Sequence, residues 1–159
     1  MPDMLVHLLK LPDDREDIER LAAEGITIRR GKPLERSVVR KYVLGRWSEI
    51  WADEVEMAFS HQPPTLILAT HDKQIIGFGT YETTCRGFFG PTGVNEEYRG
   101  KGIGRVLLIE CLKGLREMGY VYGIIGGVGP ADFYAKAVGA ALIPDSVPGF
   151  YFDMLKRET

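Results

Sequence analysis

The chain has 159 residues, of which 45% are hydrophobic and 26% are charged, and its formal net charge is −2. This length is typical of one domain that buries a core without staples, and the weak net charge argues against nucleic acid as a general partner. Cys85 and Cys111 are far apart and have no histidine nearby in the sequence, so we expect reduced core thiols and no metal site.

The start of the chain carries no recognisable export signal. Its apolar stretch, residues 5–11, is short, is interrupted by His7 and Lys10, and has no basic region before it. These features are typical of neither a signal peptide nor a membrane span. We therefore expect a cytoplasmic protein without a membrane partner.

The first part of the chain predicts strands and helices in alternation. In chain order we expect a strand at residues 4–9, a helix after residues 12–14 that runs to residue 23, a strand at 26–30, and a helix from 33 to 44 that Gly45 breaks. Apolar residues from 47 to 59 then recur at helical spacing. The other face of that helix carries Glu49, Asp53 and Glu56, which are either solvated or attract a cationic amine to an acceptor pocket.

The remaining elements complete a mixed α/β pattern. We expect a hairpin of residues 65–70 and 74–83, a strand at 88–94, a helix at 102–118, a strand at 121–125, a helix that holds Tyr134, and closing strands at 142–143 and 150–155. The sequence contains no repeats and no low-complexity segments. This alternation predicts helices around one sheet.

A glycine-rich, basic loop stands directly before the helix at 102–118. It reads Arg99-Gly100-Lys101-Gly102-Ile103-Gly104, and Arg105 follows. Glycine permits a close backbone approach and a positive φ, and the first amides of a helix have no intrahelical partner. The loop therefore predicts a site for a pyrophosphate-bearing small molecule.

Two common glycine loops do not fit this sequence. A Walker loop needs Ser or Thr after its lysine, but Gly102 follows Lys101. A dinucleotide fingerprint needs a third glycine, but that position holds Arg105 or Leu107, depending on the register. A turn without a ligand is the remaining alternative to an anion site.

The pattern Arg-x-x-Gly-x-Gly after a strand resembles the acyl-CoA-binding motif of the GCN5-related N-acetyltransferases (GNAT). The later segment 132–140, Asp-Phe-Tyr-Ala-Lys-Ala-Val-Gly-Ala, is similar to a second motif of that family, with one residue inserted before the glycine. The resemblance covers residues 26–155. It implies a central mixed β-sheet with splayed parallel strands flanked by helices, and one domain at 1–159 with a strand–helix extension at 1–25 and a core at 26–155.

The resemblance also implies a set of coenzyme-binding residues. They are Gly93, Val94, Asn95, Arg99, Gly100, Lys101, Gly102, Ile103, Gly104, Arg105 and Tyr134. Acetyl-CoA would be the cosubstrate, without a metal. The Val94 amide would donate to the thioester oxygen, and Tyr134 would be the general acid for the departing thiolate.

The general base and one coenzyme contact are less well defined. Glu82 is the carboxylate that could face the acceptor, whereas Glu96 and Glu97 fit a helix entry or a solvated loop. The family commonly has an asparagine seven residues before its tyrosine, where the side chain touches the pantetheine. Here that residue is Gly127, so this contact is lost or is made by main chain.

The leading hypothesis is an N-acetyltransferase that acylates a primary amine by direct attack in a ternary complex. The acceptor could be a small metabolite, a polyamine, an aminoglycoside-like drug or a protein amino group. The alternatives are a non-catalytic acyl-CoA-binding regulatory module and a nucleotide-binding P-loop protein. Homodimers through the C-terminal strands are common in the family, and the sequence gives no direct sign of one.

Overall fold

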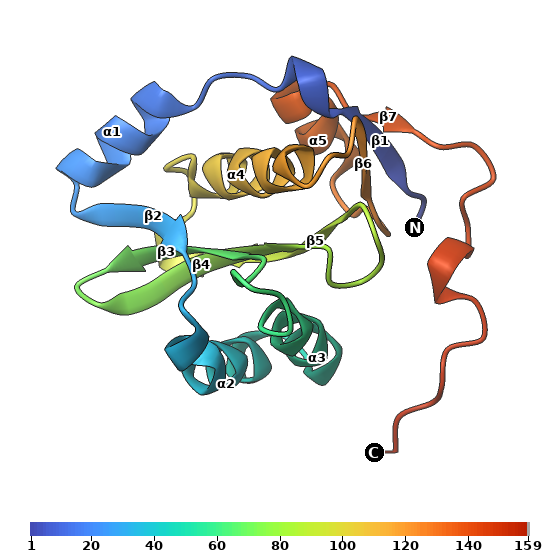
Figure 1. Cartoon of the computed structure of the whole chain (residues 1–159), viewed down its shortest axis with the longest axis horizontal. Helices are drawn as coiled ribbons and strands as arrows, with labels where there is room; N and C mark the ends of the chain where they lie inside the picture. Colours follow the sequence, from blue (N-terminus) through green and yellow to red (C-terminus); the bar gives the residue numbers. More distant parts are fainter. Residues whose placement is uncertain (159) are drawn as a thin grey trace.

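The computed structural model describes residues 1–158 and contains one seven-stranded sheet in the order β2-β3-β4-β5-β6-β1-β7 (Figure 1). The strands are β1 Met4–His7, β2 Ile26–Arg30, β3 Leu66–His71, β4 Gln74–Tyr81, β5 Phe88–Val94, β6 Tyr122–Ile125 and β7 Ala141–Leu142. Only the β5–β6 pair is parallel within the described chain. The predicted mixed α/β sheet with parallel neighbours is confirmed.

Helices cover both faces of the sheet. They are α1 Arg15–Ala23, α2 Arg36–Arg46, α3 Glu49–Ala58, α4 Ile103–Glu117 and α5 Ala131–Val138, with short 3-10 turns at Leu8–Lys10, Pro33–Glu35, Glu96–Tyr98 and Gly149–Tyr151. Figure 1 shows α1, α4 and α5 on one side and α2 and α3 on the other. Because both faces are covered, β3 is apolar at successive positions, with Leu66 and Leu68 in one core and Ile67 and Ala69 in the other.

Helix α4 lies very close to the sheet because glycines stand at the contact. A Cβ atom on Gly114 would overlap the Tyr81 ring, and one on Gly79 would lie 3.0 Å from the Cys111 sulfur. The Cys111 thiol is free and buried, and burial raises its pKa, whereas Cys85 is free and only partly buried. This tight contact positions the start of α4 against the sheet.

Ion pairs attach the flanking elements to this frame. Arg29 donates two hydrogen bonds to Glu35 (2.8 and 2.6 Å), which ties β2 to the turn before α2. On the other face, Lys113 of α4 bonds the fully buried Asp14 at the start of α1. Asp13, rather than Asp14, accepts from the Arg15 amide at this helix start.

Three predicted elements differ from the structure. The first strand ends at His7, where a 3-10 turn begins, and α2 continues through Gly45 to Arg46. The expected closing strand at 150–155 is wrong: a 3-10 turn at Gly149–Tyr151 is followed by irregular chain. The side chains of this segment line a cleft instead of extending the sheet, whose edge strand on this side is β7.

Candidate functional site

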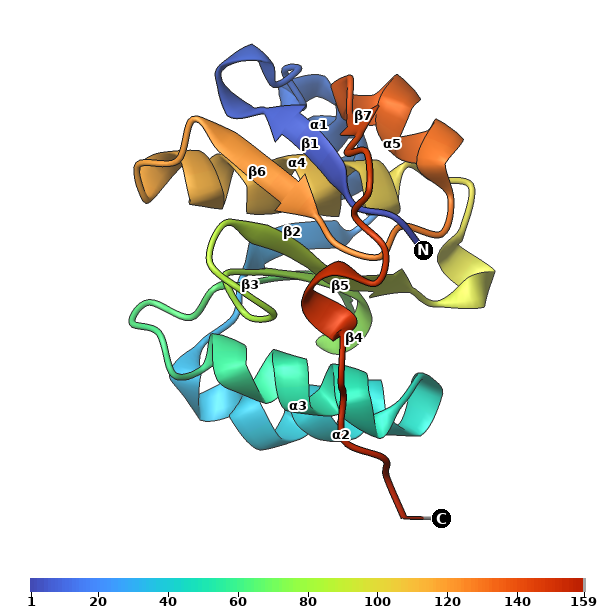
Figure 2. The ribbon, with the colours of Figure 1, turned by 90° about the vertical axis from the view of Figure 1, so that its right-hand side faces the viewer.

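A cleft of about 1360 Å³ opens between the diverging ends of β5 and β6. One end, which we call the loop end, is lined by residues 99–100 and 102–105. The other, the tail end, is lined by α3 and by residues 150–157 of the C-terminal segment. Figure 2 shows this segment descending from β7 past β5 to α3. The cleft therefore joins segments from both ends and the middle of the chain.

The two parallel strands diverge after two residue pairs. Phe88 pairs with Ile124 and Phe89 with Ile125, where β6 ends. Strand β5 continues to Val94 beside β4 alone, and the pairing register with β4 shifts after Phe89. Such a shift is a β-bulge, which bends a strand and redirects its backbone groups.

The bulge turns the backbone of the second half of β5 toward the gap. Before it, the Gly87 carbonyl accepts from the Ile124 amide (2.8 Å), so odd-numbered residues face β6. After it, the Asn95 amide donates to a β4 carbonyl (2.8 Å), so odd-numbered residues face β4. Because backbone groups alternate sides along a strand, those of Thr92 and Val94 point into the gap.

Two threonine hydroxyls hold the bulge in place. The buried Thr80 hydroxyl donates to the Pro91 carbonyl, and the Thr83 hydroxyl donates to the Gly90 carbonyl, each at 3.0 Å. Carbonyls displaced from a sheet ladder need such partners when water cannot reach them. The sequence did not suggest a role for either threonine, because no spacing rule marks them.

At the loop end, the backbone forms an anion cradle. Gly100 and Gly102 both have φ of +83°, a conformation that side chains other than glycine rarely adopt. The Val106 amide bonds the Gly102 carbonyl, so the amides of Ile103, Gly104 and Arg105 have no partner within α4. These free amides fit a phosphate group.

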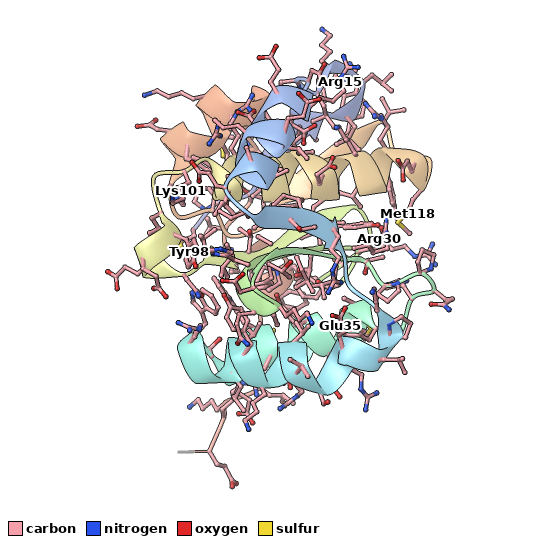
Figure 3. The ribbon with its side chains drawn as sticks, turned by 90° about the vertical axis from the view of Figure 1, so that its left-hand side faces the viewer. Arg15, Arg30, Glu35, Tyr98, Lys101 and Met118 are labelled. Atoms are coloured by element: carbon pink, nitrogen blue, oxygen red, sulfur yellow. The ribbon has the colours of Figure 1, made fainter. Side chains whose placement is uncertain are left out.

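The three basic side chains of the loop differ in whether they line the cleft and in whether they form an ion pair with α1. Arg99 lines the cleft and forms no ion pair within residues 1–158. Lys101 bonds Glu24 of α1 (3.2 Å), while Arg105 lines the cleft and bonds Asp17 (2.7 Å). Figure 3 labels Lys101 at this edge of the molecule. Arg99 is thus the free charge at the cradle.

Tyr134 lines the cleft. Its ring is buried against Phe89 and Phe133, with centroids 6.3 and 5.2 Å away. None of the hydrogen bonds among residues 1–158 involves its hydroxyl, and the residue lines the cleft. Burial raises the pKa of this phenol, so it stays protonated above its ordinary range near 10.

Not every predicted coenzyme residue reaches the cleft. Val94, Arg99, Gly100, Gly102, Ile103, Gly104, Arg105 and Tyr134 line it. Gly93 faces α2 and α3 instead, since a Cβ there would lie 2.5 Å from the Trp47 ring. The Asn95 side chain is buried and accepts from the Tyr42 hydroxyl (2.5 Å), so it anchors the strand end.

Glu82, the expected base, is turned away from the cleft. Its carboxylate accepts from the Tyr120 hydroxyl (2.6 Å) and from the Gly87 amide (3.3 Å). Both contacts shape the turn between β4 and β5. Glu96 and Glu97 form a 3-10 turn and do not line the cleft in the part of the chain that the structure describes.

The backbone conformation at position 127 and the Tyr151 ring above it both favour glycine. The φ of Gly127 is +54°, and its amide donates to the Asp3 carboxylate (2.8 Å). The Tyr151 ring lies over it, 3.4 Å from the position of a Cβ, and the Tyr151 hydroxyl lies 3.2 Å from the Cβ position of Gly126. Tyr151 therefore covers the strand end where the family commonly has an asparagine side chain.

Sequence reasoning missed Glu54 of α3. It lines the tail end of the cleft, half-buried, together with Ile50 and Trp51. Burial, above all, raises the pKa of its carboxyl, although a hydrogen bond from Thr84 acts in the opposite direction. The helical pattern placed Glu54 between two surface acids, and no sequence signal separates it from them.

Comparison with known proteins gives one family. The family model described as "Acetyltransferase (GNAT) family" matches residues 33–139. No curated protein matches the chain. Within residues 1–158, no helix is long and apolar enough to cross a membrane, and no cluster of three His, Cys, Asp or Glu side chains is arranged for a metal.

Several solved structures share the fold. A fungal "GCN5-related glucosamine N-acetyltransferase region" of a multi-domain GH3 beta-N-acetylglucosaminidase has 18% identity and a TM-score of 0.70, over 89% of this chain and 19% of that one. GCN5-related N-acetyltransferases from Sphaerobacter thermophilus and Kribbella flavida have 22% and 15% identity and TM-scores of 0.62 and 0.58, over 89% of this chain and 48% and 53% of theirs. The chain thus spans from about a fifth to about a half of these proteins, and at such identities the likeness shows the fold alone.

Proposed function

This chain belongs to the acetyltransferase (GNAT) family, and from that premise we propose that it transfers an acetyl group from acetyl-CoA to a primary amine by direct attack in a ternary complex. The observation that carries the proposal is the convergence of three groups in one cleft. They are the free amides of the cradle, the backbone of Val94 in the gap, and the hydroxyl of Tyr134. We propose that residues 1–159 act as one domain in this reaction.

The cleft suits the shape of the coenzyme. The pyrophosphate would bind the amides of Ile103, Gly104 and Arg105, with Arg99 beside it. The pantetheine arm would lie in the gap, where the backbone of Thr92 and Val94 is without strand partners. The placement of the pyrophosphate rests on the backbone conformation of the loop, which requires the positive φ of Gly100 and Gly102.

The residues also suit the chemistry. Acetyl-CoA supplies the activated acyl group. The Val94 amide would donate to the thioester oxygen as negative charge develops there. Tyr134 would donate a proton to the departing sulfur, since its phenol stays neutral at physiological pH.

The second candidate is a non-catalytic acyl-CoA-binding module. Gly127 in the usual asparagine position favoured it, but Tyr151 covers this position from another segment. The two functions differ in thiol release: a module binds acetyl-CoA and releases no CoA with any amine. Among acceptors, glucosamine, which one structural neighbour's name mentions, and polyamines are candidates to test.

The test is calorimetric titration of the protein with acetyl-CoA, CoA and ATP. We expect acetyl-CoA to bind and ATP not to displace it. Gly102→Val should weaken acetyl-CoA binding about 100-fold, because a β-branched residue is strained at positive φ and its Cβ would lie 3.1 Å from Arg20.

The matched control is Gly45→Ala. Gly45 lies inside α2 with no atom within 4 Å of its Cβ position, so binding should be unchanged. If the unaltered protein binds neither acetyl-CoA nor CoA, the proposed function is wrong. If Gly102→Val binds as tightly as the parent, the cradle is not the pyrophosphate site.

A further inference from the structure

The tail end of the cleft has mostly apolar walls. Ile50 and Trp51 of α3 form one wall, and Phe150, Tyr151 and Met154 of the C-terminal segment form the other. The two walls come from segments about 100 positions apart, and Arg157 holds them together through Glu49 (3.1 Å). Figure 2 shows the segment passing α3 in this way.

The acids on the outer face of α3 are neutralised within the protein. Glu56 bonds Arg40 (3.0 Å), and Asp53 bonds both Arg40 (3.4 Å) and Arg157 (3.1 Å). Glu49 bonds Arg157 as well. These three carboxylates, which the sequence offered as attractors of a cationic amine, are therefore occupied.

Glu54 is the acid of α3 without a basic partner within residues 1–158. It stands among the apolar walls of the tail end rather than on the solvated face. Its charge acts on a residue of the opposite wall. The pKa of the Tyr151 hydroxyl is raised chiefly by burial and, second, by the negative charge of Glu54. Glu54 and Tyr151 thus line the same end of the cleft from two separate segments.

A half-buried carboxylate that accepts a hydrogen bond from Thr84 but has no basic partner within residues 1–158 has two chemical consequences. It attracts a cation, since an unpaired charge in apolar surroundings is unfavourable. It is also a stronger base than an exposed glutamate, because burial raises its pKa. Both consequences suit an amine that must lose a proton before it attacks.

We infer that the acceptor is a primary amine with one positive charge and an apolar body, and that Glu54 receives its ammonium group and takes its proton. This inference rests on the proposed function. The body of the acceptor lies between Trp51 and Met154, and the amine reaches toward Val94 and Tyr134 in the same cleft.

The protons balance in this scheme. Glu54 takes one proton from R–NH3+, and the free amine attacks the thioester carbon, so that a C–N bond forms and the C–S bond breaks. Tyr134 gives a proton to the thiolate and is reprotonated by the second proton that leaves the nitrogen. The products are R–NH–CO–CH3, CoA–SH and one proton released from Glu54 to solvent.

The walls disfavour two other classes of amine. A sugar amine needs several neutral polar partners for its hydroxyls, whereas the lining is mostly apolar and four of the polar residues at the tail end, Glu54, Asp153, Lys156 and Arg157, are charged. A polyamine carries further positive charges, and these would meet Lys156 and Arg157 at the same end of the cleft.

The test measures acetylation of 2-phenylethylamine, glucosamine and spermidine by the unaltered protein, by Glu54→Gln and by the matched control Glu56→Gln. We expect 2-phenylethylamine to have the highest kcat/KM. Glu54→Gln should lower that value about 100-fold, Glu56→Gln should leave it unchanged, and both should bind acetyl-CoA normally by calorimetry. The rate of the unaltered protein should fall at acid pH as Glu54 is protonated, and this limb should be absent in Glu54→Gln.

A second variant keeps the inference testable if Glu54→Gln fails to fold. The Met154 side chain is exposed on the cleft wall, so Met154→Lys should fold. The variant should raise the KM for 2-phenylethylamine at least tenfold, because the new positive charge repels the ammonium group and an apolar contact is lost. Melting temperatures of all variants check the folds. Glu54→Gln should melt above the parent at pH 7, because the parent buries an unpaired charge, and should match it near pH 3.

The outcomes separate the two proposals. If the unaltered protein does not bind acetyl-CoA, the proposed function is wrong and the inference falls with it. If acetyl-CoA binds and glucosamine or spermidine is acetylated in preference to 2-phenylethylamine, only the inference is wrong. If acetyl-CoA binds and no amine is acetylated, the transferase proposal and the inference are both wrong. It is also wrong if Glu54→Gln behaves like Glu56→Gln.

Discussion

The two ends of the cleft are built in different ways. The loop end is made of main chain: amides at the start of α4, glycines with positive φ, and the bulged half of β5. The tail end is made of side chains from α3 and the C-terminal segment, which are joined by exposed ion pairs. One end therefore depends on backbone conformation and the other on which side chains meet.

This difference separates two roles. Backbone groups stay the same when a side chain is substituted, so under the proposed function the loop end suits the coenzyme. Side chains on two separate segments can be substituted one at a time without disturbing the sheet, so under the same proposal the tail end suits the selection of an acceptor. The three predictions below test this division.

The largest effect is expected at Tyr134, where the two ends meet. Tyr134→Phe removes the proton donor and should lower kcat about tenfold to a hundredfold, while acetyl-CoA binding stays nearly intact. Steady-state kinetics and calorimetry measure the two quantities. Tyr122→Phe, at an exposed position outside the cleft lining, is the control. Unchanged turnover in Tyr134→Phe would exclude the general-acid role.

A smaller effect is expected at Thr80, which holds the bulge of β5. Thr80→Val keeps the shape but leaves the Pro91 carbonyl without its donor, and it should lower the free energy of unfolding by about 1–2 kcal/mol. Acetyl-CoA should also bind more weakly, because the backbone in the gap shifts. Urea unfolding and calorimetry provide the measurements.

The chain offers a matched control for this change. The Thr65 hydroxyl is buried without a hydrogen-bond partner among the described residues. Thr65→Val should therefore be neutral or stabilising. If both valine variants behave alike, the hydrogen bond to Pro91 does not hold the bulge.

The smallest effect is expected at Arg157, which ties the C-terminal segment to α3. Its ion pairs are exposed and screened by solvent, so Arg157→Ala should raise the KM for the amine only about threefold, and less at high salt. The coenzyme affinity should not change. Arg15→Ala breaks an exposed pair far from the cleft and serves as the control. A loss of acetyl-CoA binding would contradict the division into two ends.

The elements with strong local signals agreed with the sequence prediction. The helix after the glycine loop, the strand at 88–94 and the turn before Tyr134 lie where their patterns placed them, because glycine positions and apolar spacing act locally. The segment at 150–155 was wrongly predicted as a strand, since its aromatic residues cover a cleft rather than fill a sheet.

Sequence patterns could indicate the site residues whose placement depends on the local backbone, but not those whose placement depends on distant side chains. Residues 99–105 and Tyr134 belong to local motifs, and all of them except Lys101 line one cleft. The direction of a side chain such as Glu54 or Glu82 depends on partners distant in the sequence. Spacing along the chain contains no information about those partners.

The sequence by itself determined the loop end of this protein, because positive φ at glycine and unpaired amides at a helix start are properties of a few consecutive residues. Only the tertiary structure decided the tail end. There, Arg40 and Arg157 form ion pairs with three acids of α3, whereas Glu54 has no basic partner within residues 1–158 and lines the cleft. Charge neutralisation depends on distances between segments, and folding sets those distances.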